Sequence, residues 1–193
     1  MPIVLDPLPP SNDVPQDGKW FVSTDPTDAV VTFGEAAAHM RLANSADQTY
    51  VTKLIAAAVD FAEDSMETSL APRTITANFY DGEPIILPRT PLISISSVTA
   101  NEVALSFGTG YTVKHVGRAA EVKLLSGSYP VVVVYQAGYA DVTRVKPSIR
   151  QAILMHVATL YENRESITDR AKLSVPHTLE AFYRLNRRTV GAG

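Results

Sequence analysis

Histidines and clustered carboxylates are the side chains of this chain that could support metal or acid–base chemistry. The four histidines are far apart, and no two have the His-x-x-x-His spacing that places two ligands on one helix face. They are His39, His115, His156 and His177. His156 shares a predicted helix face with Ile153 and Val157, so we expect it to be a hydrogen-bonded core histidine. We predict no zinc site, no other metal and no cofactor.

A group of acidic residues lies on one side of another predicted helix. Its members are Asp60, Glu63, Asp64 and Glu67. A di-metal carboxylate site in a helical bundle needs Glu-x-x-His motifs on partner helices, and the chain contains no such motif. We therefore interpret the group as a solvated acidic face rather than a metal site.

Motifs for nucleophilic or nucleotide chemistry are also missing. The chain has no cysteine, which excludes thiolate catalysis, disulfide bonds and cysteine-bound zinc. It contains no Gly-x-Ser-x-Gly elbow, Walker loop or dinucleotide fingerprint, and Gly108-Thr109-Gly110 is short enough to be a simple turn. We therefore predict that the protein is not an enzyme.

Charge divides the chain into two unequal parts. Residues 1–140 hold 15 acidic and 8 basic residues, a net charge of −7, whereas residues 141–193 hold 5 acidic and 9 basic residues, a net charge of +4. The division is either chance clustering of solvated side chains or the mark of a subunit whose two ends meet partners of different charge. The basic part carries no groove-reading motif, so it does not indicate a dedicated nucleic-acid binder.

The length of 193 residues and the hydrophobic content of 46% suit one globular domain with a core of its own. No apolar run is long enough to cross a bilayer, and the first residues lack the basic-then-apolar order of a signal peptide. We therefore expect a protein that is intracellular or assembled inside a cell.

Prolines separate an N-terminal arm from this domain. Residues 1–31 contain six prolines and five aspartates, so we expect an irregular arm that either folds back onto its own domain or reaches a neighbouring subunit. Within the arm, Trp20, Phe21 and Val22 could anchor it on an apolar surface. Residues 32–188 form the predicted domain, and residues 189–193 form a flexible tail.

Apolar periodicity and capping residues predict four helices in the domain. They span about residues 33–42, 46–70, 147–164 and 177–188. Thr32 and Glu35 match a capping box at the start of the first helix, and Ser45 repeats this logic before the second. The second helix should bury a wide apolar face, in which the row Tyr50, Leu54, Ala58, Phe61 and Ser65 is widened by Val51, Ile55, Ala62 and Met66.

Between the two helical pairs the apolar period changes to the alternation typical of strands. We expect a β insert over about residues 73–139, in which Asp81-Gly82 leads the strand at 74–80 into a returning strand at 85–87. The apolar run 131–135 lacks alternation, so this strand should be covered on both faces. Together these patterns predict an α+β fold: a helical bundle of two N-terminal and two C-terminal helices with an inserted small antiparallel sheet or sandwich.

The third predicted helix carries the most specific pattern in the chain. Pro147 stands at its first position, where no intrahelical N–H bond is lost, and two apolar faces follow. The helix then ends in the polar run Tyr161-Glu162-Asn163-Arg164-Glu165. As a whole, the stretch 147–165 resembles the signature helix of the head–tail connector (adaptor) proteins of tailed double-stranded DNA bacteriophages. Weaker similarities to that family lie at 87–98 and 134–139.

The resemblance implies a structural, non-enzymatic virion protein of the phage neck, assembled in the bacterial host cytoplasm. Connector subunits form a ring, generally a dodecamer, that docks on the portal protein and extends the DNA channel towards the tail. Such a ring receives a stopper or tail-completion protein, lets genomic DNA pass without sequence-specific contact, and involves no membrane. Its closure requires head-to-tail contacts between different faces of neighbouring copies.

Three groups of residues are candidates for contacts in such a ring. The subunit-interface candidates are Tyr161, Glu162, Asn163, Arg164 and Glu165. The portal-contact candidates, at the end of the last helix, are Arg184, Arg187 and Arg188. The channel-lining candidates, whose negative charge would repel the phosphates of passing DNA, are Asp60, Glu63, Asp64 and Glu67.

Other interpretations stay open. The arginines near the two helix ends could simply complement the helix dipoles. The chain could be another neck component, a stopper or tail-completion protein, although such proteins tend to be mostly β. It could also be a small cytosolic binding domain or enzyme with a pocket at the helix–sheet junction.

Overall fold

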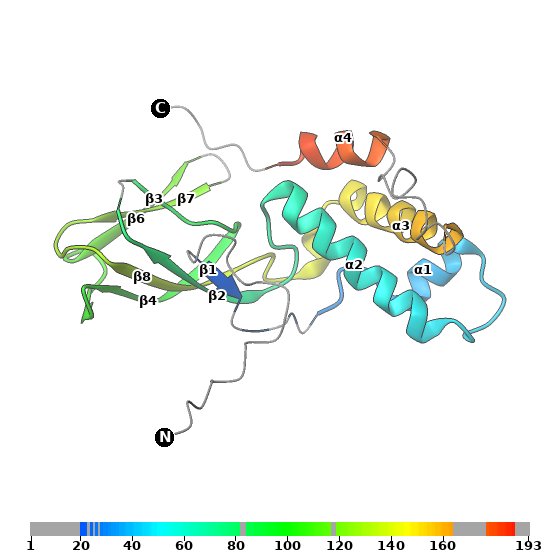
Figure 1. Ribbon diagram of the computed structural model, residues 1–193, viewed down its shortest axis with the longest axis horizontal. Coiled ribbons are helices and arrows are strands. Elements are labelled where there is room, and N and C mark those ends of the chain that lie inside the picture. Colours follow the sequence, from blue (N-terminus) through cyan, green and yellow to red (C-terminus); the bar gives the residue numbers. More distant parts are fainter. Residues whose placement is uncertain are drawn as a thin grey trace, which may run out of the picture.

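The computed structural model describes residues 20–22, 24, 26, 28–81, 84–116, 119–163 and 177–187. Helices occupy one end of the molecule and β strands the other (Figure 1). After one short strand, the order along the chain is two helices, a β insert and two further helices. The predicted α+β fold is confirmed.

Four α-helices and their shared core form the helical end. They are α1 (Phe33–Met40), α2 (Gln48–Met66), α3 (Pro147–Glu162) and α4 (His177–Leu185). A short 3₁₀ helix, η1 (Val142–Arg144), leads into α3. The core includes Val51 of α2, Ile153 of α3 and Tyr183 of α4, all fully buried. Packing of these apolar faces, more than helix propensity, holds the four helices together.

The helix ends follow the predictions in part. At α1 the capping box is present: the Thr32 hydroxyl accepts from the Glu35 N–H at 3.3 Å, and the Glu35 carboxylate accepts from the Thr32 N–H at 2.8 Å. The Ser45 cap is wrong, because α2 begins at Gln48 after Asp47, and no side chain caps it. The predicted end at residue 70 is also wrong, since Glu67 adopts a left-handed φ of 53° and stops the helix at Met66.

The buried face of α2 is one side of the wide apolar face that was predicted. Its centre is the row Val51, Ile55, Ala62 and Met66, whereas Leu54 and Phe61 are only half-buried. This row faces inward at the end of α2 that meets the β insert, and Glu63, which follows Ala62, is buried with it.

Two antiparallel sheets make up the β end. In spatial order the first holds β1 (Trp20–Val22), β2 (Arg73–Phe79), β8 (Val131–Ala137), β4 (Leu92–Ala100) and β5 (Val103–Ala104). The second holds β3 (Ile85–Ile86), β7 (Ala119–Leu124) and β6 (Tyr111–Val116). One apolar core takes side chains from both sheets, such as Val133 of the first and Val122 of the second, so the insert is a small sandwich.

Strand pairing differs from the local predictions in three places. β3 pairs with β7 rather than returning along β2, because both edges of β2 are taken by β1 and β8. β8 is buried on one face and half-buried on the other, so full coverage of both faces is not found. Residues 20–22 of the predicted arm pair with β2, which is the folded-back alternative for that part of the arm.

Candidate assembly surfaces and the helix–sheet junction

The C-terminal end of α2 meets the β insert through a buried ion pair. Glu63 is 3% exposed, and one of its carboxylate oxygens lies 2.8 Å from the Arg73 guanidinium at the start of β2. Its other oxygen accepts the Leu70 N–H at 2.6 Å. Asp60, on the outer side of α2, lies 3.7 Å from the same guanidinium. The junction therefore contains a carboxylate that is almost fully shielded from water.

A second arginine, Arg89, ties the loop before β4 to the same helix end. Its guanidinium donates to the Glu63 carbonyl at 2.5 Å and to the Asp64 carboxylate. Its backbone N–H donates to the Tyr135 hydroxyl at 3.1 Å, and its guanidinium carbon lies 5.0 Å from the centre of the Trp20 ring. Arg89 thus connects α2 with β8 and β1, and the Trp20 contact has cation–π geometry.

A third ion pair connects the end of α4 to the C-terminal end of α2. Arg187, just after α4, donates from its guanidinium to the Glu67 carboxylate at the end of α2. These side chains are 57% and 32% exposed, so solvent screens the pair and it contributes little to stability.

The acidic group at 60–67 is therefore only in part a solvated face. Each of its four carboxylates faces an arginine, and the prediction of a solvated, channel-lining side chain is wrong for Glu63. Burial raises the pKa of Glu63, and the charge of Arg73 opposes that rise. Asp60 and Asp64 keep exposed side chains, at 52% and 72%.

The two arginine partners, Arg73 and Arg89, are not among the residues predicted for the site, although they share a sequence signal. Each follows a proline directly, in Pro72-Arg73 and Pro88-Arg89. Proline is confined to strand ends and edges because it has no N–H to donate, and both arginines stand at such places: Arg73 begins β2, and Arg89 lies between β3 and β4.

The five subunit-interface candidates differ in exposure, and two of them lie outside the described residues. Tyr161 is half-buried and donates its hydroxyl proton to the Asp47 carboxylate at 2.6 Å, so it packs within its own subunit. Glu162 is exposed, and Asn163 ends α3 with its side-chain amide donating to the Thr159 carbonyl at 2.7 Å. Arg164 and Glu165 lie outside the described residues.

The portal-contact candidates are divided in the same way. Arg184 is exposed on α4. Arg187 is engaged with Glu67, so one candidate for the portal and one for the channel neutralise each other within the subunit. Arg188 lies outside the described residues.

His156 is a core histidine, as predicted, with 4% exposure. Its ring lies edge-on to Phe61 at 5.2 Å between centroids and 6.3 Å from the Tyr183 ring. Burial lowers the pKa of His156 and raises that of Tyr183. The expected hydrogen bond is not found for its Nδ1, which has no partner among the described residues.

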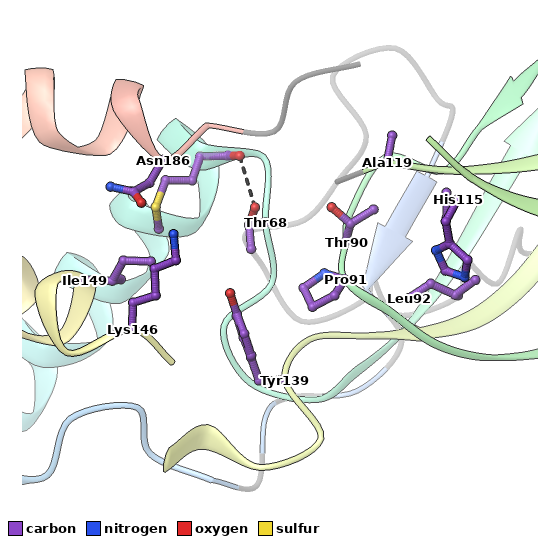
Figure 2. A pocket seen from close by; sticks show the side chains of 12 residues that line it. Thr68, Thr90, Pro91, Leu92, His115, Ala119, Tyr139, Lys146, Ile149 and Asn186 are labelled. Carbon is purple, nitrogen blue, oxygen red and sulfur yellow. Dashed lines mark hydrogen bonds between the residues drawn. The ribbon is translucent and has the colours of Figure 1, made fainter. Parts of the chain in front are cut away.

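A cavity of about 300 Å³ opens at the helix–sheet junction, in the place that a binding domain would use. Figure 2 shows its lining, with Lys146, Ile149 and Asn186 on the helical side and Leu92 and His115 on the β side. Within the described part of the chain, no three His, Asp or Glu side chains are grouped to hold a metal ion. No described helix is both long and apolar enough to span a bilayer.

Comparisons by sequence find no match, neither to a family model nor to a curated protein. Comparison by structure finds chains from gene transfer agent (GTA) particles, each 18–19% identical in sequence. A chain of the native GTA virion matches with a TM-score of 0.70, over 90% of this chain and 98% of the other.

Two further matches come from the neck of these particles. One, from the neck of the empty particle computed with C6 symmetry, has a TM-score of 0.69 over 90% of this chain and 98% of the other. Another, from the neck of the native particle computed with C12 symmetry, has a TM-score of 0.60 over 88% and 97%. At this level of identity the likeness establishes the fold, and the protein therefore shares its fold, across nearly its whole length, with chains found in the necks of phage-like particles.

Proposed function

We propose that the protein is a structural subunit of a phage neck, a ring-forming head–tail connector that docks on the portal and extends the DNA channel. One observation carries the proposal: the shared fold covers 88–90% of this chain and 97–98% of the matched chains, so no large extra domain separates them. The resemblance of residues 147–165 to the connector signature helix supports it independently.

The proposed ring contains six or twelve copies, in keeping with the C6 and C12 symmetries of the matched necks. Its other partners are the portal protein, a stopper or tail-completion protein, and passing DNA, with assembly in the host cytoplasm. The balance of helices and strands does not fit a mostly-β stopper or tail-completion protein. The role is non-enzymatic.

Side-chain exposure supports a choice among the candidate residues for each proposed surface. Of the α3 candidates, Glu162 is exposed and projects from the end of the signature helix, so it serves the subunit interface best. Of the α4 candidates, Arg184 is free to meet a portal surface. Asp60 and Asp64 are the most exposed of the four acidic side chains and the best placed to face DNA.

Particle assembly without this chain tests the function. We expect cells making such particles to accumulate DNA-filled heads and free tails, with joined particles restored by the wild-type chain supplied in trans. Joined, DNA-retaining particles formed in its absence would refute the proposal.

Ring formation tests the interface. We expect Glu162→Lys to reduce joined particles at least tenfold, because a reversed charge opposes a partner group on the next copy. Glu102→Lys is the matched control, an exposed glutamate in the β4–β5 turn. Equal effects of the two variants would exclude Glu162 from the interface.

A further inference from the structure

The junction cavity has an apolar floor and a rim of hydrogen-bond donors. The floor includes Met66, Leu92 and Ile149, and the rim includes the hydroxyl of Tyr139 and the ammonium group of Lys146. In Figure 2 the Tyr139 hydroxyl points towards the space between Lys146 and Thr68. A pocket of this size, near the lower end for ligand sites, has room for a few side chains.

The one formally charged side chain among the described residues of the cavity lining is a cation, Lys146. Lys146 and His115 are the ionisable side chains with basic character there, and no carboxylate is among the described residues that line it. Lys146 and His115 are both exposed. The lining therefore favours an occupant that combines apolar side chains with a negative charge.

The N-terminal segment of this chain has that composition. Ile3, Val4 and Leu5 are followed directly by Asp6, and residues 1–18 contain three aspartates and no lysine or arginine. Pro2 and Pro7, which flank the run Ile3–Asp6, lack the N–H group that strand pairing needs, so a long backbone ladder is disfavoured and side chains provide most of the binding contacts.

The first described residue, Trp20, lies near the cavity, so the N-terminal segment that precedes it is long enough to reach the cavity. The Trp20 ring lies 5.0 Å from the guanidinium carbon of Arg89, and the next residue, Thr90, lines the cavity. The twelve residue steps from Leu8 to Trp20 span up to about 40 Å. A tether of this length gives an effective concentration of the order of millimolar, so a contact whose dissociation constant lies below about a millimolar is mostly formed within one chain.

We propose that the cavity at the helix–sheet junction binds residues 2–8 of the same chain, with Ile3–Leu5 on its apolar floor and the Asp6 carboxylate beside Lys146. This contact holds the N-terminal arm at the junction between the helices and the β insert. This assignment does not depend on the proposed neck function.

Disulfide trapping in the full-length chain tests the proposal directly, because the chain has no cysteine of its own. Val4→Cys is combined with Asn186→Cys on the cavity rim, or with Ala56→Cys on the exposed side of α2 as the control pair. At low protein concentration we expect the rim pair to close at least tenfold faster than the control pair, with the product a monomer. Equal rates would overturn the proposal, and preferential cross-linking between two copies would overturn the assignment to the same chain.

A charge swap tests the polar contact. We expect Asp6→Lys and Lys146→Glu each to slow closure of the rim pair at least fivefold, and the combined variant to recover most of the rate. Asp17→Lys is the control and should leave the rate unchanged. Unfolding temperatures of all variants establish that the fold is intact, and failure of the combined variant to recover would rule out the Asp6–Lys146 contact.

Discussion

Removing the buried carboxylate of Glu63 should be among the most destabilising changes in this protein. In Glu63→Ala the Arg73 guanidinium, with 11% of its side chain exposed, loses the oxygen at 2.8 Å, and the Leu70 N–H loses its acceptor at 2.6 Å. Breaking a buried pair by removing one partner costs about 3–5 kcal/mol. With a urea m-value of about 2 kcal/mol/M, the unfolding midpoint should fall by about 1.5–2.5 M.

Urea titration measures this loss with two probes. The only tryptophan, Trp20, lies beside Arg89 and so reports on the junction, while far-UV circular dichroism reports on the helices. Asp60→Ala is the matched control, since its carboxylate is 52% exposed and 3.7 Å from the same guanidinium. It should cost about 0–1 kcal/mol.

Paired substitution separates loss of the charge pair from loss of packing. Glu63→Met combined with Arg73→Met leaves no unpaired charge in the junction, so it should recover a large part of the stability lost in Glu63→Ala. The reasoning fails if Glu63→Ala costs less than about 1 kcal/mol, or if Asp60→Ala costs as much.

Three further changes follow from single contacts. Gly138→Ala should lower the free energy of unfolding by more than about 4 kcal/mol or fail to fold, because φ is +124° and a Cβ would lie 2.2 Å from the Ala71 carbonyl oxygen. The control is Gly34→Ala, whose Cβ would meet nothing closer than 3.9 Å, and it should be neutral or stabilising in the same urea titration. Tyr161→Phe should cost about 1–2 kcal/mol by removing the hydroxyl bound to a carboxylate, and no loss of melting temperature would contradict this. Burial lowers the pKa of His156 below its unfolded value of 6.5, so as the pH falls the unfolded chain binds the proton before the folded chain does. The free energy of unfolding should therefore fall below about pH 6.5. This fall should be smaller in His156→Phe, and equal pH profiles of the two proteins would refute the prediction.

The sequence predicts best what depends on neighbours along the chain. Thr32 and Glu35 meet because they are three residues apart at a helix start, and Pro147 opens α3 because its fixed φ suits that position. Strand alternation likewise places β2, over Arg73–Phe79, close to the strand predicted at 74–80. Each of these features is decided by local geometry, which short windows of sequence contain.

Pairing between distant segments is what the sequence does not predict. Asp81-Gly82 is a turn signal in the sequence, yet the choice of β7 as the partner of β3 depends on which edges of β2 are already occupied. The arginines that pair with α2 lie 10 to 120 residues away from their acidic partners. No periodic pattern in either segment encodes such a contact.

Glu63 shows why a charge pattern can mislead. Acidic residues are almost never fully buried unless they are paired, so a cluster of four on one helix is expected to face water. Here the apolar row from Val51 to Met66 turns α2 so that Glu63 faces the sheet, and Arg73 supplies the compensating charge. The helix face is set by its largest apolar side chains, and the acid follows them inward.

This arrangement has a consequence for a subunit that works in a ring. The pair of Glu63 with Arg73 and the contacts of Arg89 are buried or half-buried, so water and salt weaken them little, and they fix the β insert relative to α2. The Arg187–Glu67 pair that ties down α4 is exposed and screened. Raising the salt concentration should therefore loosen α4 long before it loosens the junction, so amide hydrogen exchange in α4 should accelerate in 1 M salt while exchange in β2 stays slow. Equal acceleration in α4 and β2 would show that the Glu63–Arg73 pair does not hold the β insert to α2.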